Sequence, residues 1–153
     1  MIRLVLVLIA LAMLGTCQVK ANEPIDWPKL MQAIGERESG LYRNAWNKLE
    51  RAAGIYQMRP LALKDASDWA KDQGGKGWTE ADLYDTRQAA AAMRGYYMRW
   101  RHRARTPEEF CRLWNGGSGW IYKAYKTDEY AASVTARYYQ LVQQSRDRSP
   151  KLL

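Results

Sequence analysis

The amino-acid sequence predicts a mainly α-helical domain with a small loop or hairpin region near residues 41–59. Apolar side chains recur at helical spacing in several segments, and helix start signals stand before most of them. Outside residues 41–59, no segment has the pattern of a convincing strand. The 153 residues are enough for one domain, with no internal repeat and no low-complexity linker.

The first helix is predicted to begin at Asp26-Trp27-Pro28, with Asp as the N-cap and Pro in the first turn. Its apolar face continues through Ile34, and four residues later it reaches Glu38. At about 100° per residue, Glu38 lies roughly 20° around the helix from Trp27. Gly40 supplies a helix stop. The carboxyl group of Glu38 is therefore expected on the apolar face, at the end of the helix.

A carboxyl group in this position allows two interpretations. If it packs against the apolar face, desolvation favours its neutral form and raises its pKa. A carboxyl group that is still protonated near neutral pH can act as a general acid. If the last helical turn frays instead, Glu38 lies in water and has no special role. The helix geometry alone leaves both interpretations open.

Four further helices are predicted. Pro60 opens the second, which ends at Gly74-Gly75, and Asp85 caps the third, which is predicted to be the longest. The remaining predictions concern the C-terminal part of the chain: a capping box at Thr106-Pro107-Glu108-Glu109, a last helix capped by Thr127, and a tail over residues 146–153.

Residues 1–21 have the pattern of a signal peptide. A positive start at Arg3 precedes an unbroken apolar run of eleven residues, and small residues lead to a cleavage site after Ala21. Eleven residues are too few for a comfortable membrane span. A lipoprotein site at Cys17 and an uncleaved anchor remain as alternatives. We expect an exported protein, periplasmic or extracellular, that is cut near Ala21 and keeps one domain over residues 22–145.

The chain is basic, and it stays basic without the signal peptide. Loss of residues 1–21 removes Arg3 and Lys20 and no acidic residue, which leaves 22 Lys and Arg against 16 Asp and Glu, a formal charge of +6. Such a surface suits a polyanion, for example a cell-wall polymer, a membrane surface or a nucleic acid, although solubility alone also explains it. Seven Trp and ten Tyr residues add side chains that stack on sugar rings.

The sequence predicts no metal site and no cofactor. Zinc sites use clustered Cys and His side chains, and the chain after residue 21 holds one of each, Cys111 and His102. His102 lies in a basic run, where a solvated surface role is expected, and no nucleophile-elbow motif supports a catalytic triad. The glycine-rich stretch Gly116–Gly119 lacks the Lys and the preceding strand of a phosphate-binding loop.

Four motifs occur in a fixed order after the start of the first helix. They are Glu38-Ser39-Gly40, Gly54-Ile55-Tyr56-Gln57-Met58-Arg59-Pro60, Leu113-Trp114-Asn115-Gly116-Gly117 and Thr127-Asp128-Glu129-Tyr130-Ala131-Ala132-Ser133-Val134. In this order and at these spacings they resemble the soluble lytic transglycosylase family of the lysozyme superfamily. The resemblance covers roughly residues 27–138.

The resemblance implies a lysozyme-like α+β fold and cleavage of the β-1,4 bond between MurNAc and GlcNAc in peptidoglycan. The family works with one glutamic acid, which corresponds to Glu38 and serves as both general acid and general base. The product carries a 1,6-anhydro ring on MurNAc. The implied partner is the peptidoglycan glycan strand, with no metal or cofactor, and we expect a monomer.

The resemblance also implies a set of substrate-binding residues. Ser39 corresponds to the Ser after the catalytic Glu, and Gln57 to the Gln of the Gly-Leu-Met-Gln motif. Asn115 and Tyr130 match the family at their positions, whereas Trp114 replaces a Tyr. Tyr56 also departs from the family, which has Met at this position. Tyr42 and Trp46 lie outside the family pattern and are candidate sugar contacts.

Two alternative functions remain. A hydrolytic lysozyme would deliver water to the same bond, and its second carboxyl group would be sought among Glu50, Asp65 and Asp68. A non-catalytic binder of cell wall or nucleic acid would use the basic, aromatic stretch 94–105. The export signal and Glu38 argue against nucleic acid as the partner.

Overall fold

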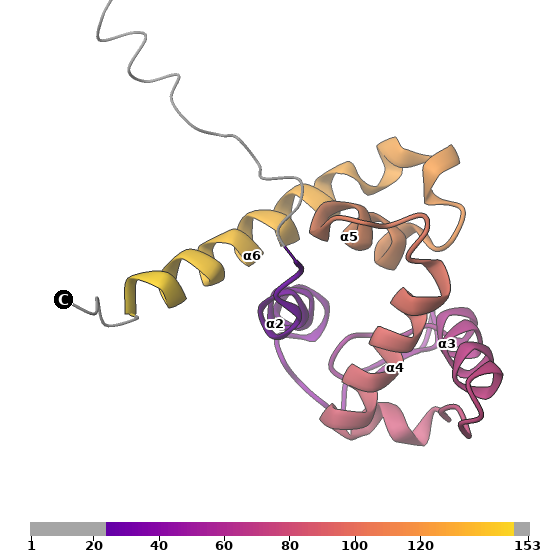
Figure 1. The fold of residues 1–153 in the computed structure, drawn as a ribbon. Helices are drawn as coiled ribbons and strands as arrows, with labels where there is room; N and C mark the ends of the chain where they lie inside the picture. The colour runs from indigo at the N-terminus through magenta and orange to yellow at the C-terminus, as the bar shows by residue number, and fades with distance from the viewer. Residues whose placement is uncertain (1–23, 149–153) are drawn as a thin grey trace, which may run out of the picture.

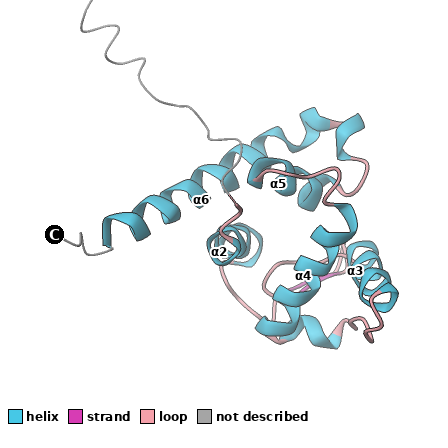
Figure 2. Ribbon diagram, viewed as in Figure 1, coloured by secondary structure: helices cyan, strands magenta, loops and turns pink. Residues whose placement is uncertain are grey.

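The computed structural model describes residues 24–148, and its fold is mainly helical with one small antiparallel sheet (Figures 1 and 2). The helices are α2 (Trp27–Ser39), α3 (Pro60–Asp72), α4 (Thr86–Trp100), α5 (Pro107–Gly116) and α6 (Asp128–Arg148). Short 3-10 helices are η1 (Ala81–Tyr84), η2 (Trp120–Tyr122) and η3 (Ala124–Thr127), and the strands are β1 (Trp46–Asn47) and β2 (Ala52–Ala53). The mainly α class and the small hairpin near residues 41–59 are confirmed.

The start signals read from the sequence are present in the structure. The Asp85 carboxylate accepts hydrogen bonds from the backbone N–H groups of Arg87 and Gln88, each at 2.9 Å. Thr106 and Glu109 form the predicted reciprocal capping box at the start of α5. These signals act within one helical turn, which is why they can be read without knowledge of the tertiary fold.

Three predictions for the helices are wrong or incomplete. The longest helix of the described part is α6, with 21 residues, whereas α4 has 15. Because α6 continues to Arg148, it includes the first three residues of the predicted tail. Helix α6 begins directly after Thr127, as predicted, but the buried Thr127 hydroxyl donates to the Ala124 carbonyl at 2.7 Å and accepts from Arg112 instead of capping the helix. The predicted signal peptide, residues 1–21, and residues 149–153 lie outside the described part.

Helix α2 is held in the hydrophobic core by its buried side chains. Helix α6 packs against both α2 and α5, and α3 packs against α4 beside the small sheet (Figure 1). Fully buried side chains include Leu30 and Ile34 of α2, Phe110 and Leu113 of α5, and Val134 of α6. The C-terminal end of α2 is therefore fixed by packing, and its last turn faces α6. Between residues 24 and 148, no helix is long and apolar enough to cross a membrane.

Candidate functional site

The central contact of the site joins the last turn of α2 to the first turn of α6. The hydroxyl group of Tyr130 donates a hydrogen bond of 2.6 Å to Oε1 of Glu38. Glu38 is half-buried and Tyr130 is buried. Among the described residues, no second group hydrogen-bonds to this carboxyl group. Oε2 therefore remains as the oxygen that can exchange a proton with a ligand.

The surroundings of Glu38 favour its neutral form. Burial raises the pKa of the Glu38 carboxyl group above the ordinary value of 4.5, and the hydrogen bond from Tyr130 lowers it by less. The charges of Arg59 and Arg37 also lower the pKa of Glu38, while that of Glu50 raises it. Burial, helped by the Glu38 charge, holds the pKa of Tyr130 well above 10.0, so its hydroxyl remains a donor.

Neighbouring side chains on α2 form ion pairs with α6 at the surface. Arg137 pairs with Glu36 through two contacts, of 2.6 Å and 3.0 Å. Arg37 lies 3.6 Å from the exposed carboxylate of Glu129. Glu36 and Glu38 thus have different roles, because one is ion-paired at the surface and the other faces Tyr130.

Ser39 connects the end of α2 to the turn that follows β2. Its hydroxyl group donates a hydrogen bond of 2.7 Å to the backbone carbonyl of Ile55. Glu38 and the turn formed by residues 54–58 are consequently held next to each other. The role of the Ser39 hydroxyl in this structure is to position the turn, because it bonds the backbone of Ile55.

Gln57 occupies an unusual backbone conformation in this turn. Its φ angle is 51°, in the left-handed region that side chains rarely adopt, and its side-chain Nε2 donates to the Gly54 carbonyl at 2.9 Å. Gly54 has φ 76°, and a Cβ atom at this position would lie 2.1 Å from the carbonyl oxygen of Leu83. Only glycine fits there, which explains why the motif of residues 54–60 begins with glycine.

Trp114 and Asn115 reach the same turn from the end of α5. The indole Nε1 of Trp114 donates to the Tyr56 carbonyl at 3.3 Å, and its ring contacts Tyr96 edge to face. The backbone carbonyl of Asn115 accepts a hydrogen bond of 2.9 Å from Arg59. Residues of the first three motifs, which are distant in sequence, thus meet around one turn, and Tyr130 of the fourth motif bonds Glu38.

A cavity of about 200 Å³ lies beside this turn. It is lined by Gln57, Arg59, Leu61, Ala62, Asp65, Tyr96, Trp114, Gly116, Gly117 and Ser118. Glu38 is not part of this lining. Two candidate residues, Gln57 and Trp114, therefore face the cavity, and Ser39 links their turn to the Glu38–Tyr130 pair.

Arg59 is the residue that sequence analysis missed. Its guanidinium group lines the cavity, bonds the Asn115 carbonyl and pairs with Glu50 at 2.9 Å and 3.1 Å. Its charge also acts on Glu38. Its position two residues after Gln57, inside a recognised motif, is the sequence feature that could have identified Arg59 as a site residue. An arginine at the start of a helix is expected to be a solvated surface residue unless its tertiary contacts are known.

The remaining candidates differ in their exposure and contacts. Tyr42 and Trp46 are exposed, with 61% and 46% of their surface accessible, so both are available to a ligand. Asp65 lines the cavity and accepts a hydrogen bond of 2.9 Å from Trp100. Asp68 is ion-paired with Lys64 on another face of α3.

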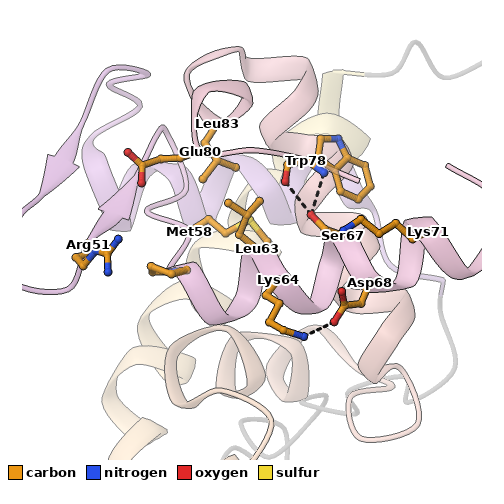
Figure 3. Close-up of a pocket in the computed structure, with 11 residues that line it drawn as sticks. Arg51, Met58, Leu63, Lys64, Ser67, Asp68, Lys71, Trp78, Glu80 and Leu83 are labelled. Carbon is orange, nitrogen blue, oxygen red and sulfur yellow. Dashed lines mark hydrogen bonds and ion pairs between the residues drawn. The ribbon is translucent and has the colours of Figure 1, made fainter. Parts of the chain in front are cut away.

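A second cavity of about 290 Å³ lies on that other face of α3 (Figure 3). Met58, Leu63 and Leu83 form apolar walls, and the Ser67 hydroxyl bonds both the N–H and the carbonyl of Trp78 at 2.9 Å. This cavity shares no lining residue with the first one. The serine bonds serve to hold the loop before η1 against α3.

The sequence matches no protein-family model, and no curated protein is significantly similar to it. The case for a function therefore rests on the residues themselves. Within residues 24–148, no group of three or more His, Cys, Asp or Glu side chains is arranged to hold a metal ion.

Proposed function

We propose that this protein is an exported, lysozyme-like lytic transglycosylase that cleaves the β-1,4 bond between MurNAc and GlcNAc in peptidoglycan. The observation that carries the proposal is the half-buried Glu38 carboxyl group, whose pKa is raised and whose Oε1 accepts a hydrogen bond from Tyr130. A carboxyl group with a raised pKa, linked through Ser39 to a turn that lines a cavity with aromatic and amide side chains, suits general acid catalysis on a sugar.

In the proposed first step, Glu38 donates its proton to the glycosidic oxygen while the bond from C1 of MurNAc to that oxygen breaks. The substrate's own N-acetyl carbonyl stabilises the positive charge that develops at C1. The 6-hydroxyl group of the same ring then attacks C1, and Glu38 takes the hydroxyl proton. The products are a free 4-hydroxyl group on GlcNAc and a 1,6-anhydro-MurNAc end, and Glu38 is again protonated.

This route needs one carboxyl group because the nucleophile belongs to the substrate, and an intramolecular nucleophile has a large entropic advantage. Gln57 and Trp114 would bind the glycan strand at the cavity, where the Asn115 carbonyl holds the lining residue Arg59. Ser39 and Tyr130 would hold the turn and the acid. Tyr42 and Trp46 would contact sugars farther along the strand.

Hydrolysis at the same bond is the second candidate function. The supporting observation is the Glu50 carboxylate, which is close enough to raise the pKa of Glu38. A second carboxylate near the acid could orient a water molecule. Because Glu50 is already paired with Arg59, we favour the transglycosylase reaction.

Mass spectrometry of digested peptidoglycan tests the proposal directly. The transglycosylase leaves anhydro ends, about 18 mass units lighter than the reducing ends of a lysozyme, a difference of one water. Glu38→Gln should lower the rate at least a hundredfold, the range typical of losing a general acid. Glu36→Gln removes a carboxyl group from the same helix and should keep most activity. Reducing ends would identify a lysozyme, and a wild-type protein that releases no fragment would contradict both enzymes.

A further inference from the structure

A short exposed segment follows the cavity-lining glycine loop. Within residues 120–126, which span η2 and the first three residues of η3, the accessible fractions are 45% for Ile121, 78% for Tyr122 and 72% for Tyr125. Large apolar and aromatic side chains that are exposed together in so short a stretch are typical of an interaction surface.

Two lysines alternate with these aromatic residues. Lys123 and Lys126 are exposed and form no ion pair within the described part of the chain, and Nζ of Lys126 lies 6.0 Å from the centre of the Tyr125 ring. The nearby Arg112 differs, because Glu108 and Asp128 both pair with it. The charge of the segment 120–126 is therefore available to an anionic partner.

The position of the segment connects it to the proposed site. Gly117 and Ser118 line the 200 Å³ cavity, and the N–H group of Trp120 bonds the Gly117 carbonyl at 3.1 Å. Arg103, which lies over the Trp100 ring, donates a hydrogen bond of 2.7 Å to the Ser118 carbonyl. A polymer bound in the cavity would leave it beside the segment 120–126.

We propose that the segment 120–126 binds the acidic peptides attached to peptidoglycan strands, so that the enzyme prefers peptide-bearing strands to strands stripped of peptide. The inference rests on the proposed function, and it names the form of the substrate. Peptide carboxylates complement Lys123 and Lys126, and the rings of Tyr122 and Tyr125 offer flat surfaces for apolar side chains and sugars.

Kinetics on soluble glycan strands test the inference, with one batch of strands kept intact and another treated with an amidase that removes the peptides. We expect the wild-type KM to be three- to tenfold lower on intact strands. The double variant Lys123→Gln with Lys126→Gln should lose this difference while kcat stays the same. Lys71→Gln with Lys76→Gln, which changes one exposed lysine in the last turn of α3 and one in the loop after it, is the charge-matched control and should retain the preference.

Binding of the Glu38→Gln variant to the same strands separates this inference from the proposed function, because it needs no turnover. Tighter binding to intact strands, weakened by the lysine changes and by 300 mM salt, would support a peptide-binding segment even if no bond is cleaved. Equal binding to intact and stripped strands would overturn it. So would lysine-dependent binding to phosphatidylglycerol vesicles without any preference between the two kinds of strand, which would assign the segment to a membrane surface.

Discussion

The Tyr130 hydroxyl group donates a hydrogen bond of 2.6 Å to Oε1 of Glu38, and the two residues are 92 positions apart in the chain. This contact ties the first described helix to the last one. It also opposes the effect of burial, because it lowers the pKa that burial raises. The pair therefore orients the carboxyl group while leaving it easier to protonate than an exposed glutamate.

Tyr130→Phe removes this donor and keeps the ring. The pKa of Glu38 should rise further, because the ionised form loses its hydrogen bond while burial remains. Activity should fall about tenfold, since a hydrogen bond to a charged group is worth about 1.5–3 kcal/mol and part of that loss is regained by the longer persistence of the acid form. NMR titration of labelled carboxyl groups and a pH–rate profile measure the two effects.

Tyr138→Phe is the matched control for this change. The Tyr138 hydroxyl accepts a hydrogen bond of 3.1 Å from the backbone N–H of Asp26, also between α6 and the start of α2. Its loss should reduce stability but leave the pKa of Glu38 unchanged. An unchanged pKa in Tyr130→Phe as well would show that the Glu38–Tyr130 contact has no electrostatic effect.

Glu38→Gln should change stability in a way that depends on pH. Because burial raises the folded pKa of Glu38, the contribution of this carboxyl group to stability is fully present below the ordinary value of 4.5 and is lost as pH rises through the folded pKa. Glutamine stays neutral and can still accept from Tyr130. The variant should therefore have a Tm close to the wild type near pH 4 and a higher Tm at pH 7. If the Tm of the variant minus that of the wild type were lower at pH 7 than at pH 4, the result would contradict a desolvated Glu38.

Much of the local structure could be predicted because its causes lie within a few residues. The capping box at Thr106, the cap at Asp85 and the glycine stop at Gly40 were all readable from the sequence. The face of α2 that carries Glu38 followed from periodicity alone. The extension of α6 to Arg148 was missed because polar residues dominate its last turns, after the buried Leu141.

The arrangement of the site depended on long-range contacts, which a single sequence does not show. The pairing of Arg59 with Glu50 and its bond to the Asn115 carbonyl join three segments that have no local relation. The same is true of Trp114, whose indole bonds the carbonyl of Tyr56. The resemblance to a family named candidate residues in four motifs, but Arg59 lies after the Gly-Leu-Met-Gln part to which Gln57 corresponds.

Gln57→Gly and Gln57→Ala should differ in stability but not in activity. Both remove the side-chain amide, so both should raise KM if Gln57 contacts the glycan. Gly adopts the φ of 51° without strain, whereas Ala keeps a left-handed backbone that costs about 1–2 kcal/mol relative to Gly. Chemical denaturation should thus find the Ala variant less stable than the Gly variant. The opposite order would mean that the turn relaxes to another conformation.

Arg59→Met and Glu50→Gln should move the pKa of Glu38 in opposite directions. Loss of the Arg59 charge removes a cation that lowers this pKa, and loss of the Glu50 charge removes an anion that raises it. The pH at which activity declines on the alkaline side should shift upward in the first variant and downward in the second. Arg59→Lys should restore the wild-type pH dependence but not the wild-type KM, because a single nitrogen replaces the guanidinium fork that pairs with Glu50 through Nε and Nη2 and with the Asn115 carbonyl through Nη1. Shifts of the same sign would show that the variants act by rearranging the turn, and a Glu50→Gln variant without any hydrolysis would assign the water-orienting role to Glu50.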